Sequence, residues 1–164
     1  MKKSICILLL MCLLTACGGE KPMETVQDVY TPLNDTPMQV ELTLPADATV
    51  QTLSSDAGKL YLCDSFTVMV QTLPGGDLSR TLRDTTGYAQ DLLTLIETEK
   101  AGVTCYRLSW ATVGEGGDQA ARTIILDDGK FHYAITVMAS AEKAGDLKDT
   151  WQRIFSSVKL STGS

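Results

Sequence analysis

The stretch that decides the fold is QAARTIILDDGKFHYAITVM, residues 119–138. It holds two strand-like runs, 119–126 and 130–138, on either side of Asp127-Asp128-Gly129. An Asp-Gly pair readily adopts the left-handed backbone that a tight hairpin turn requires. In the second run every other residue is large and apolar: Phe131, Tyr133, Ile135 and Val137. Because successive side chains of a strand point to opposite faces, this alternation predicts a hairpin with one buried face.

Further strands are predicted on both sides of this hairpin, where short runs of β-branched and apolar residues are bounded by turn residues. Residues 103–113 alternate, with aromatic and apolar side chains on one face and Cys105 and Arg107 on the other. Residues 88–98 fit helical spacing as well as a hairpin, and a strand from about Leu93 to Thr98 is favoured. The remaining predicted strands are residues 39–44, 50–53, 59–63 and 65–73.

Two helices are predicted beside the strands. Asp77 is a good N-cap for a short helix over residues 78–86, and Gly87 would end it as a C-cap glycine. The last helix follows Gly145-Asp146, and its apolar residues form one stripe at helical spacing. The stripe consists of Leu147, Trp151, Ile154, Phe155 and Val158. The pattern predicts an α+β fold, an antiparallel β-sheet of about six strands with flanking helices.

The stretch Leu14-Thr15-Ala16-Cys17-Gly18 resembles the lipobox of bacterial lipoproteins. Lys2 and Lys3 precede an apolar run over residues 4–14, which is too short to span a bilayer because a span needs ~20 apolar residues. The resemblance implies that a peptidase cuts before Cys17 and that a diacylglycerol joins its thiol. An ordinary secretory signal or a hydrophobic cytosolic helix is the alternative.

The predicted organisation is a lipoprotein signal peptide (1–16), a lipidated N-terminus with a flexible tether (17–38) and a single α+β domain (39–164). The tether is inferred from scattered Gly and Pro residues and from the lack of any period. Two acyl chains hold a protein stably at a bilayer. We therefore expect a lipid-anchored protein on the extracytoplasmic face of the cell membrane.

The chain is acidic, with 14 Lys and Arg against 20 Asp and Glu and a net charge of −6. Removal of residues 1–16 would take away Lys2 and Lys3 and no acidic residue, which leaves −8. Such a surface repels nucleic acid and anionic lipid headgroups, so no nucleic-acid partner is expected. The lipid would have to hold the protein at the membrane, and the acidity itself is most simply explained by solubility.

Five cysteines are present, of which Cys6 and Cys12 would leave with the signal peptide and Cys17 would be lipidated. Cys63 and Cys105 remain, and outside the cytoplasm they either form a disulfide or pack as two buried thiols. Two cysteines and the single His132 are too few for a metal site, so no metal is expected.

No catalytic constellation is visible, and no cofactor is expected. His132 is expected on the face opposite Phe131, as a solvent-facing or sheet-covering side chain, because nothing points to a nucleophile and an acid beside it. Asp127 and Asp128 fit the hairpin turn better than a Ca²⁺ loop, which needs more oxygen ligands. Trp110 and Trp151 fit core packing better than ligand stacking. The loop over residues 114–118 lacks the Lys-Ser/Thr of a phosphate-binding loop.

From about Val40 to Leu160 the chain resembles the PsbP-like family. The likeness is carried by a strand, turn and helix at 65–78, by Thr86-Gly87-Tyr88, by residues 103–110 and 128–133, and by the closing helix at 151–158. Val158 departs from the Phe that is usual in the family. The resemblance implies an antiparallel sheet flanked by helices and service as a binding or accessory subunit. It assigns no catalytic residue.

The favoured function is therefore a binding or accessory module of the cell envelope, with an envelope protein as its partner. The expected contact surface is the sheet face opposite the helices or the hairpin loop over residues 114–118. A small-ligand carrier or an extracytoplasmic hydrolase is the alternative.

Overall fold

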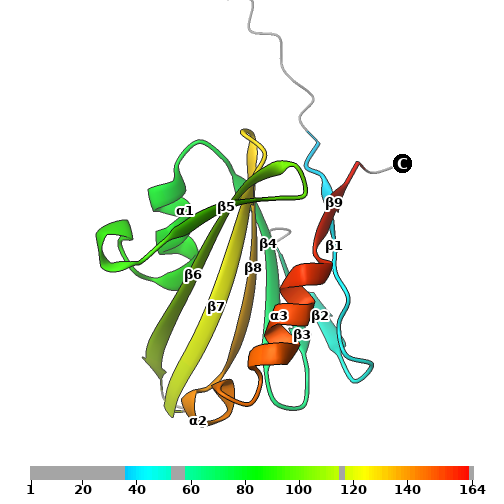
Figure 1. Ribbon diagram of the computed structural model, residues 1–164, viewed down its shortest axis with the longest axis vertical. Coiled ribbons are helices and arrows are strands. Elements are labelled where there is room, and N and C mark those ends of the chain that lie inside the picture. Colours follow the sequence, from blue (N-terminus) through cyan, green and yellow to red (C-terminus); the bar gives the residue numbers. More distant parts are fainter. Residues whose placement is uncertain (1–35, 53–57, 115–116, 163–164) are drawn as a thin grey trace, which may run out of the picture. The chain divides into compact units, whose positions relative to one another are not determined.

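The predicted hairpin lies in the middle of an antiparallel sheet in the computed structural model of the protein (Figure 1). The structure describes residues 36–52, 58–114 and 117–162, which belong to one compact unit, Asp35–Ser164. Strand β7 (Gly117–Asp127) pairs with β8 (Phe131–Ser140), and Asp127 lies opposite His132. Gly129 in the turn has φ 87°, so the predicted Asp-Gly hairpin is confirmed.

Seven strands form the main sheet in the order β2-β3-β4-β8-β7-β6-β5, and each neighbouring pair is antiparallel. The α+β class is confirmed, and this sheet has one strand more than the six predicted. Its other strands are β2 (Thr49–Thr52), β3 (Gly58–Leu62), β4 (Thr67–Pro74), β5 (Ile96–Lys100) and β6 (Val103–Gly114).

A second, two-stranded sheet joins the beginning of the described domain to its end. Strand β1 (Gln39–Glu41) pairs with β9 (Lys159–Ser161), and Val40 lies opposite Leu160. The predicted strand to Leu44 is too long, because the partner strand offers only three residues for pairing. Strand β9 was not predicted, since three residues are too few to show an alternating pattern.

Helix α1 (Leu78–Thr86) has the predicted bounds and caps. Asp77 Oδ1 accepts a hydrogen bond from the Arg80 N–H at 2.9 Å, and the Gly87 N–H donates to the Arg83 carbonyl at 2.8 Å. The ambiguous residues 88–98 contain both kinds of structure, a 3₁₀ turn η1 (Gln90–Leu92) and then the beginning of β5. Two further helices follow β8, the short α2 (Ala141–Ala144) and α3 (Lys148–Ser157).

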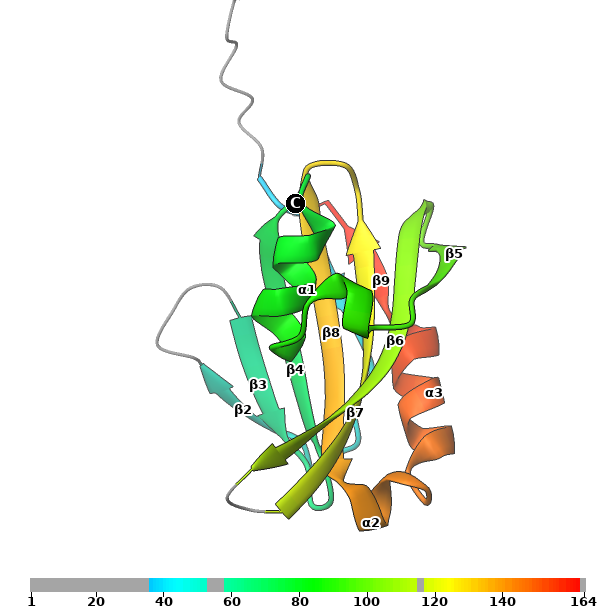
Figure 2. The ribbon, with the colours of Figure 1, turned by 90° about the vertical axis from the view of Figure 1, so that its left-hand side faces the viewer.

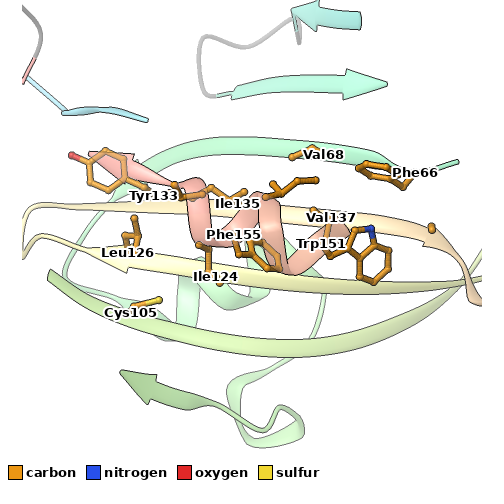
Figure 3. Close-up of a cluster of buried hydrophobic side chains, with 13 residues drawn as sticks. Phe66, Val68, Cys105, Ile124, Leu126, Tyr133, Ile135, Val137, Trp151 and Phe155 are labelled. Carbon is orange, nitrogen blue, oxygen red and sulfur yellow. The ribbon is translucent and has the colours of Figure 1, made fainter. Parts of the chain in front are cut away.

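Helices α1 and α3 cover opposite faces of the main sheet (Figures 1 and 2). Trp151 of α3 is only 1% exposed and packs in the larger core, shown in Figure 3 with Ile124, Tyr133 and Val137. The smaller core on the other face contains Leu82, Leu108, Ile125 and Ala134. The expectation of a sheet face left open opposite the helices is therefore wrong, because each face carries a helix.

The buried Tyr133 connects the segment before β1 to the β7–β8 turn. Its hydroxyl accepts from the Met38 N–H at 2.9 Å and donates to Asp128 Oδ2 at 2.7 Å. Burial and the Asp128 hydrogen bond raise the pKa of Tyr133 to about 12, although the Met38 bond opposes them. Burial also raises the pKa of Asp128, but hydrogen bonds from Phe131, Tyr133 and Lys130 outweigh it and hold that pKa below its usual value.

Cys63 and Cys105 are both free thiols. Cys63 follows β3, Cys105 lies in β6, and strands β4, β8 and β7 lie between them. Four strand spacings amount to about 19 Å, whereas a disulfide requires Cα atoms within about 7 Å. The structure therefore contains no disulfide between Cys63 and Cys105. It favours the alternative of two separate thiols, of which Cys105 is buried and Cys63 is half-buried.

Candidate functional site: an arginine-lined groove

A groove of about 340 Å³ runs between α3 and strands β5 to β7. Strand β6 contributes Arg107 to its lining, β7 contributes Arg122, and α3 contributes Gln152 and Phe155. Ile96 of the edge strand β5 lines the rim and is 60% exposed. The volume is at the lower end of the range for ligand pockets, and charged, polar and apolar groups line it together.

A second hollow of about 220 Å³ adjoins the first, because both are lined by Arg107, Ile124 and Phe155. Glu99, Lys100 and Ser156 line this second part, and Lys100 Nζ donates to the Ser156 carbonyl at 3.2 Å. The edge of β5 is thus linked to the end of α3, and together the two hollows form one groove along the helix.

Strand pairing places the two arginines side by side. Arg107 lies opposite Ile124, and Ser109 lies opposite Arg122, so Arg107 and Arg122 are diagonal neighbours on the α3 face. Diagonal pairs on a sheet have Cβ atoms roughly 7–8 Å apart, well within reach of two long side chains. Within the described residues neither guanidinium has a carboxylate partner, and Arg122 instead lies 5.8 Å from the ring centroid of Trp151.

The register places two cations on one face of neighbouring strands. Within the described residues neither guanidinium forms an ion pair, although Glu99 also lines the second hollow. The stacking of Arg122 on Trp151 fixes one guanidinium at the groove wall without neutralising it. An incoming oxyanion could pair with the planar guanidinium groups, whose donors match its geometry.

Cys105 also lines the groove but is not a nucleophile candidate. Burial raises the pKa of its thiol, and the opposing influences of Thr98, Arg107 and Lys100 do not reverse the shift. The reactive form of cysteine is the thiolate. A protonated side chain that is 1% exposed serves as packing beneath the groove.

On the opposite face, His132 is buried at 1% exposure, so the solvent-facing alternative is wrong and the side chain is covered by α1. Its Nδ1 lies 2.7 Å from Thr81 Oγ1, and its Nε2 lies 3.4 Å from Asp127 Oδ2. The Asp127 carboxylate, the His132 imidazole and the Thr81 hydroxyl therefore form a chain of three neighbouring polar groups. Thr81 is only 2% exposed, however, so a substrate has no access to the hydroxyl.

The remaining predicted sites have structural roles. Asp127 accepts from the Gly129 N–H at 2.8 Å, and Asp128 accepts from the Lys130 and Phe131 N–H groups at 2.8 and 2.7 Å. These bonds confirm the turn assignment. Within residues 36–52, 58–114 and 117–162, no three His, Cys, Asp or Glu side chains gather as metal ligands.

Both tryptophans pack in the protein, as predicted. Trp151 lies in the larger core, and the half-buried Trp110 packs against the smaller one. Trp110 Nε1 donates to Thr123 Oγ1 at 3.0 Å, and its ring meets Tyr88 edge-to-face at 6.5 Å.

Cys17 and residues 1–16 lie outside the described residues, as do residues 115–116 of the predicted contact loop. In the described part of the chain, none of the helices is both long and apolar enough to cross a membrane.

The groove itself was not predicted from the sequence. The available signal was that arginines occupy positions 107 and 122, on the strand face that also carries Cys105 and Ile124. Charged residues on a half-buried face are usually paired, and among residues 36–52, 58–114 and 117–162 neither arginine forms an ion pair.

A comparison with protein-family models and one with curated proteins give no match. Among solved structures, the chain is similar to the cyanobacterial PsbP protein CyanoP from Synechocystis, with a TM-score of 0.54, 10% identity and coverage of 90% of this chain and 98% of that one. A protein from Bacteroides thetaiotaomicron gives a TM-score of 0.52 at 12% identity, over 75% of this chain but only 45% of that chain.

The Ran-binding protein Mog1p from Saccharomyces cerevisiae gives a TM-score of 0.50 at 11% identity, over 76% of this chain and 97% of Mog1p. Identities this low establish a common fold and nothing beyond it. The predicted resemblance is thus confirmed for the fold, and the protein has a PsbP-like fold that it shares with CyanoP and Mog1p.

Proposed function

We propose that the protein is a membrane-anchored extracytoplasmic lipoprotein that acts as a binding or accessory module of the cell envelope. The observation that carries this proposal is the groove along α3, where Arg107 and Arg122 meet open space and have no carboxylate partner within the described residues. The partner would be an envelope protein that inserts a segment into the groove. Mog1p, described as a Ran-binding protein, shows one use of this fold for protein binding.

The anchor rests on the sequence around Cys17, where a basic start, a short apolar run and small residues precede the cysteine. Membrane fractionation of a Cys17→Ala variant tests it. We expect wild-type protein in the membrane fraction and the variant in the soluble fraction. Equal membrane retention of wild type and variant would contradict the lipid anchor, but it would not bear on the binding proposed for the groove.

Burial argues against the hydrolase alternative. The series of Asp127, His132 and Thr81 is closed beneath α1, and a nucleophile must be reached by its substrate. The carrier alternative calls for a deep apolar pocket, whereas the groove carries two guanidinium groups and Gln152. Both observations support binding through a surface groove.

Site-specific photo-crosslinking in the protein's own membranes tests the binding function. A photoreactive residue at the exposed Gln152 would sample the groove, and the same residue at the exposed Arg83 of α1 would sample the opposite face as a control. We expect a discrete envelope-protein adduct from position 152 and little from position 83. No adduct from position 152, or equal adducts from both, would overturn the proposal.

A further inference from the structure

Building on the proposed function, we propose that the groove selects an acidic segment of the partner protein, whose carboxylates pair with Arg107 and Arg122 while an adjoining apolar side chain packs on the groove's apolar wall. Arg107 is exposed and Arg122 half-buried, and both line the same hollow.

Charge complementarity commits the occupant to an anion. Arg107, Arg122 and Lys100 outnumber the single carboxylate of Glu99 among the groove's lining residues, and within the described part of the chain neither arginine forms an ion pair, so the groove attracts negative charge. The chain as a whole is acidic, with a net charge of −6, so most of its surface repels anionic partners. An acidic segment is thus steered toward the groove and away from most of the remaining surface.

The shape and lining of the groove favour a peptide over a bare ion. The nearly buried Phe155 and Ile124 line the floor beside the arginines, and Ile96, which is 60% exposed, supplies the main apolar surface that a ligand could cover. A free phosphate or an isolated carboxylate would leave this apolar surface wet. A segment in which acidic and apolar residues alternate would pair with the arginines and also cover the apolar surface, because alternate side chains of an extended chain point to opposite sides.

Arg122 is the better-ordered half of the pair. Its guanidinium lies over the ring of the buried Trp151, so less side-chain freedom is lost when it binds a carboxylate. Arg107 has no such support and would be ordered by the ligand. Losing either arginine should weaken binding, and losing both should abolish the preference for acidic segments.

The test uses the full lipidated chain with the photoreactive residue at position 152, in its own membranes. Adduct yield is compared among wild type, R107Q/R122Q, R107K/R122K and the matched control K59Q/R83Q, which removes two exposed cations away from the groove. The crosslinked segment is then sequenced by mass spectrometry. Far-ultraviolet circular dichroism and a thermal melt establish that each variant is folded.

We expect the adducted segment to be rich in Asp and Glu. We expect the yield to fall about tenfold or more in R107Q/R122Q, because the variant loses both charged donors that would pair with the segment's carboxylates. The adduct yield of R107K/R122K should lie between those of wild type and R107Q/R122Q, since lysine keeps the charge but loses the bidentate geometry. Added salt should lower the wild-type yield, and K59Q/R83Q should match wild type.

An undiminished yield in R107Q/R122Q, a neutral or basic segment, or adducts to lipid in place of protein would overturn this inference. In each of these cases the groove would still bind a ligand. The proposed binding function would then stand, but the partner would not be an acidic protein segment. The absence of any adduct in wild type would overturn both.

Discussion

The two faces of the main sheet carry polar groups in opposite ways. Under α1, His132 contacts Thr81 and Asp127, and Thr123 lies 2.9 Å from the hydroxyl of Thr136. Beside α3, Arg107 and Arg122 line open space without a carboxylate partner in the described residues. Buried polar groups need partners within the protein, whereas exposed cations without partners are free to bind something else. The buried polar groups under α1 thus serve the fold, whereas the two arginines beside α3 are available for recognition even though the larger core lies on that same face.

Trp151 supports both the core and the groove, so Trp151→Ala should have the largest effect on stability. The side chain is 1% exposed, packs in the larger core and stacks beneath Arg122. Truncating a buried Trp costs about 3–5 kcal/mol. Urea unfolding followed by circular dichroism measures this loss, with the exposed Gln152→Ala as the control. A loss below ~1 kcal/mol would mean that α3 is not anchored through this side chain.

His132→Ala should rank next, at about 2–4 kcal/mol, since it leaves a cavity and removes the partner of the buried Thr81 hydroxyl. The same urea titration measures the loss. If the variant were as stable as wild type while losing binding, His132 would belong to recognition and the contrast between the faces would fail.

Tyr133→Phe should cost about 1–2 kcal/mol, because it removes the hydroxyl that joins Met38 to Asp128. It should also change the pH dependence. The pKa of Tyr133 is raised to about 12, so its contribution is complete below the unfolded value of about 10 and is lost as pH rises toward 12. The urea midpoint of wild type should therefore fall between pH 9 and pH 11.5 more steeply than that of the variant. Parallel curves would contradict this role for the phenol.

Asp128 should change the stability of the protein at acidic pH. Its folded pKa lies below the usual value, so its contribution is present above about pH 4 and is lost as pH falls through the lower folded pKa. Asp128→Asn should flatten the loss of stability between about pH 4 and pH 2 relative to wild type. The urea midpoint across this range measures it, and an unchanged acid profile would show that the turn hydrogen bonds do not depend on ionisation.

R107Q/R122Q should have the smallest effect on stability, within about 0.5 kcal/mol of wild type, because no carboxylate in the described residues depends on either cation. The lost contact between the Arg122 guanidinium and the Trp151 ring should account for most of this small difference. A loss above ~2 kcal/mol in urea would show that the arginines serve the fold, and the two faces would then no longer differ in kind.

The sequence predicted most elements with strong local patterns. The β7–β8 hairpin followed from the alternation around Asp128-Gly129, and α1 followed from Asp77 and Gly87. Strand β9 and the early end of β1 could not be predicted, because three-residue strands are defined by tertiary pairing and not by periodicity. The free thiols likewise depend on strand order, which separates Cys63 from Cys105.

The groove depends on non-local geometry in the same way. Arg107 and Arg122 become neighbours only through the β6–β7 register, and α3 provides the opposite wall from the end of the chain. The lipobox-like stretch around Cys17 is a local pattern that can be read directly from the sequence, but it falls outside the described residues. Its test therefore remains biochemical.

The most direct test of the contrast between the faces is the ratio of photo-crosslinked partner at position 152 to that at position 83 in native membranes. We predict a discrete protein adduct at the groove position and little at the α1 position, with the groove adduct lost in R107Q/R122Q. Equal yields at the two positions, or a yield at position 152 that does not depend on the arginines, would contradict the account.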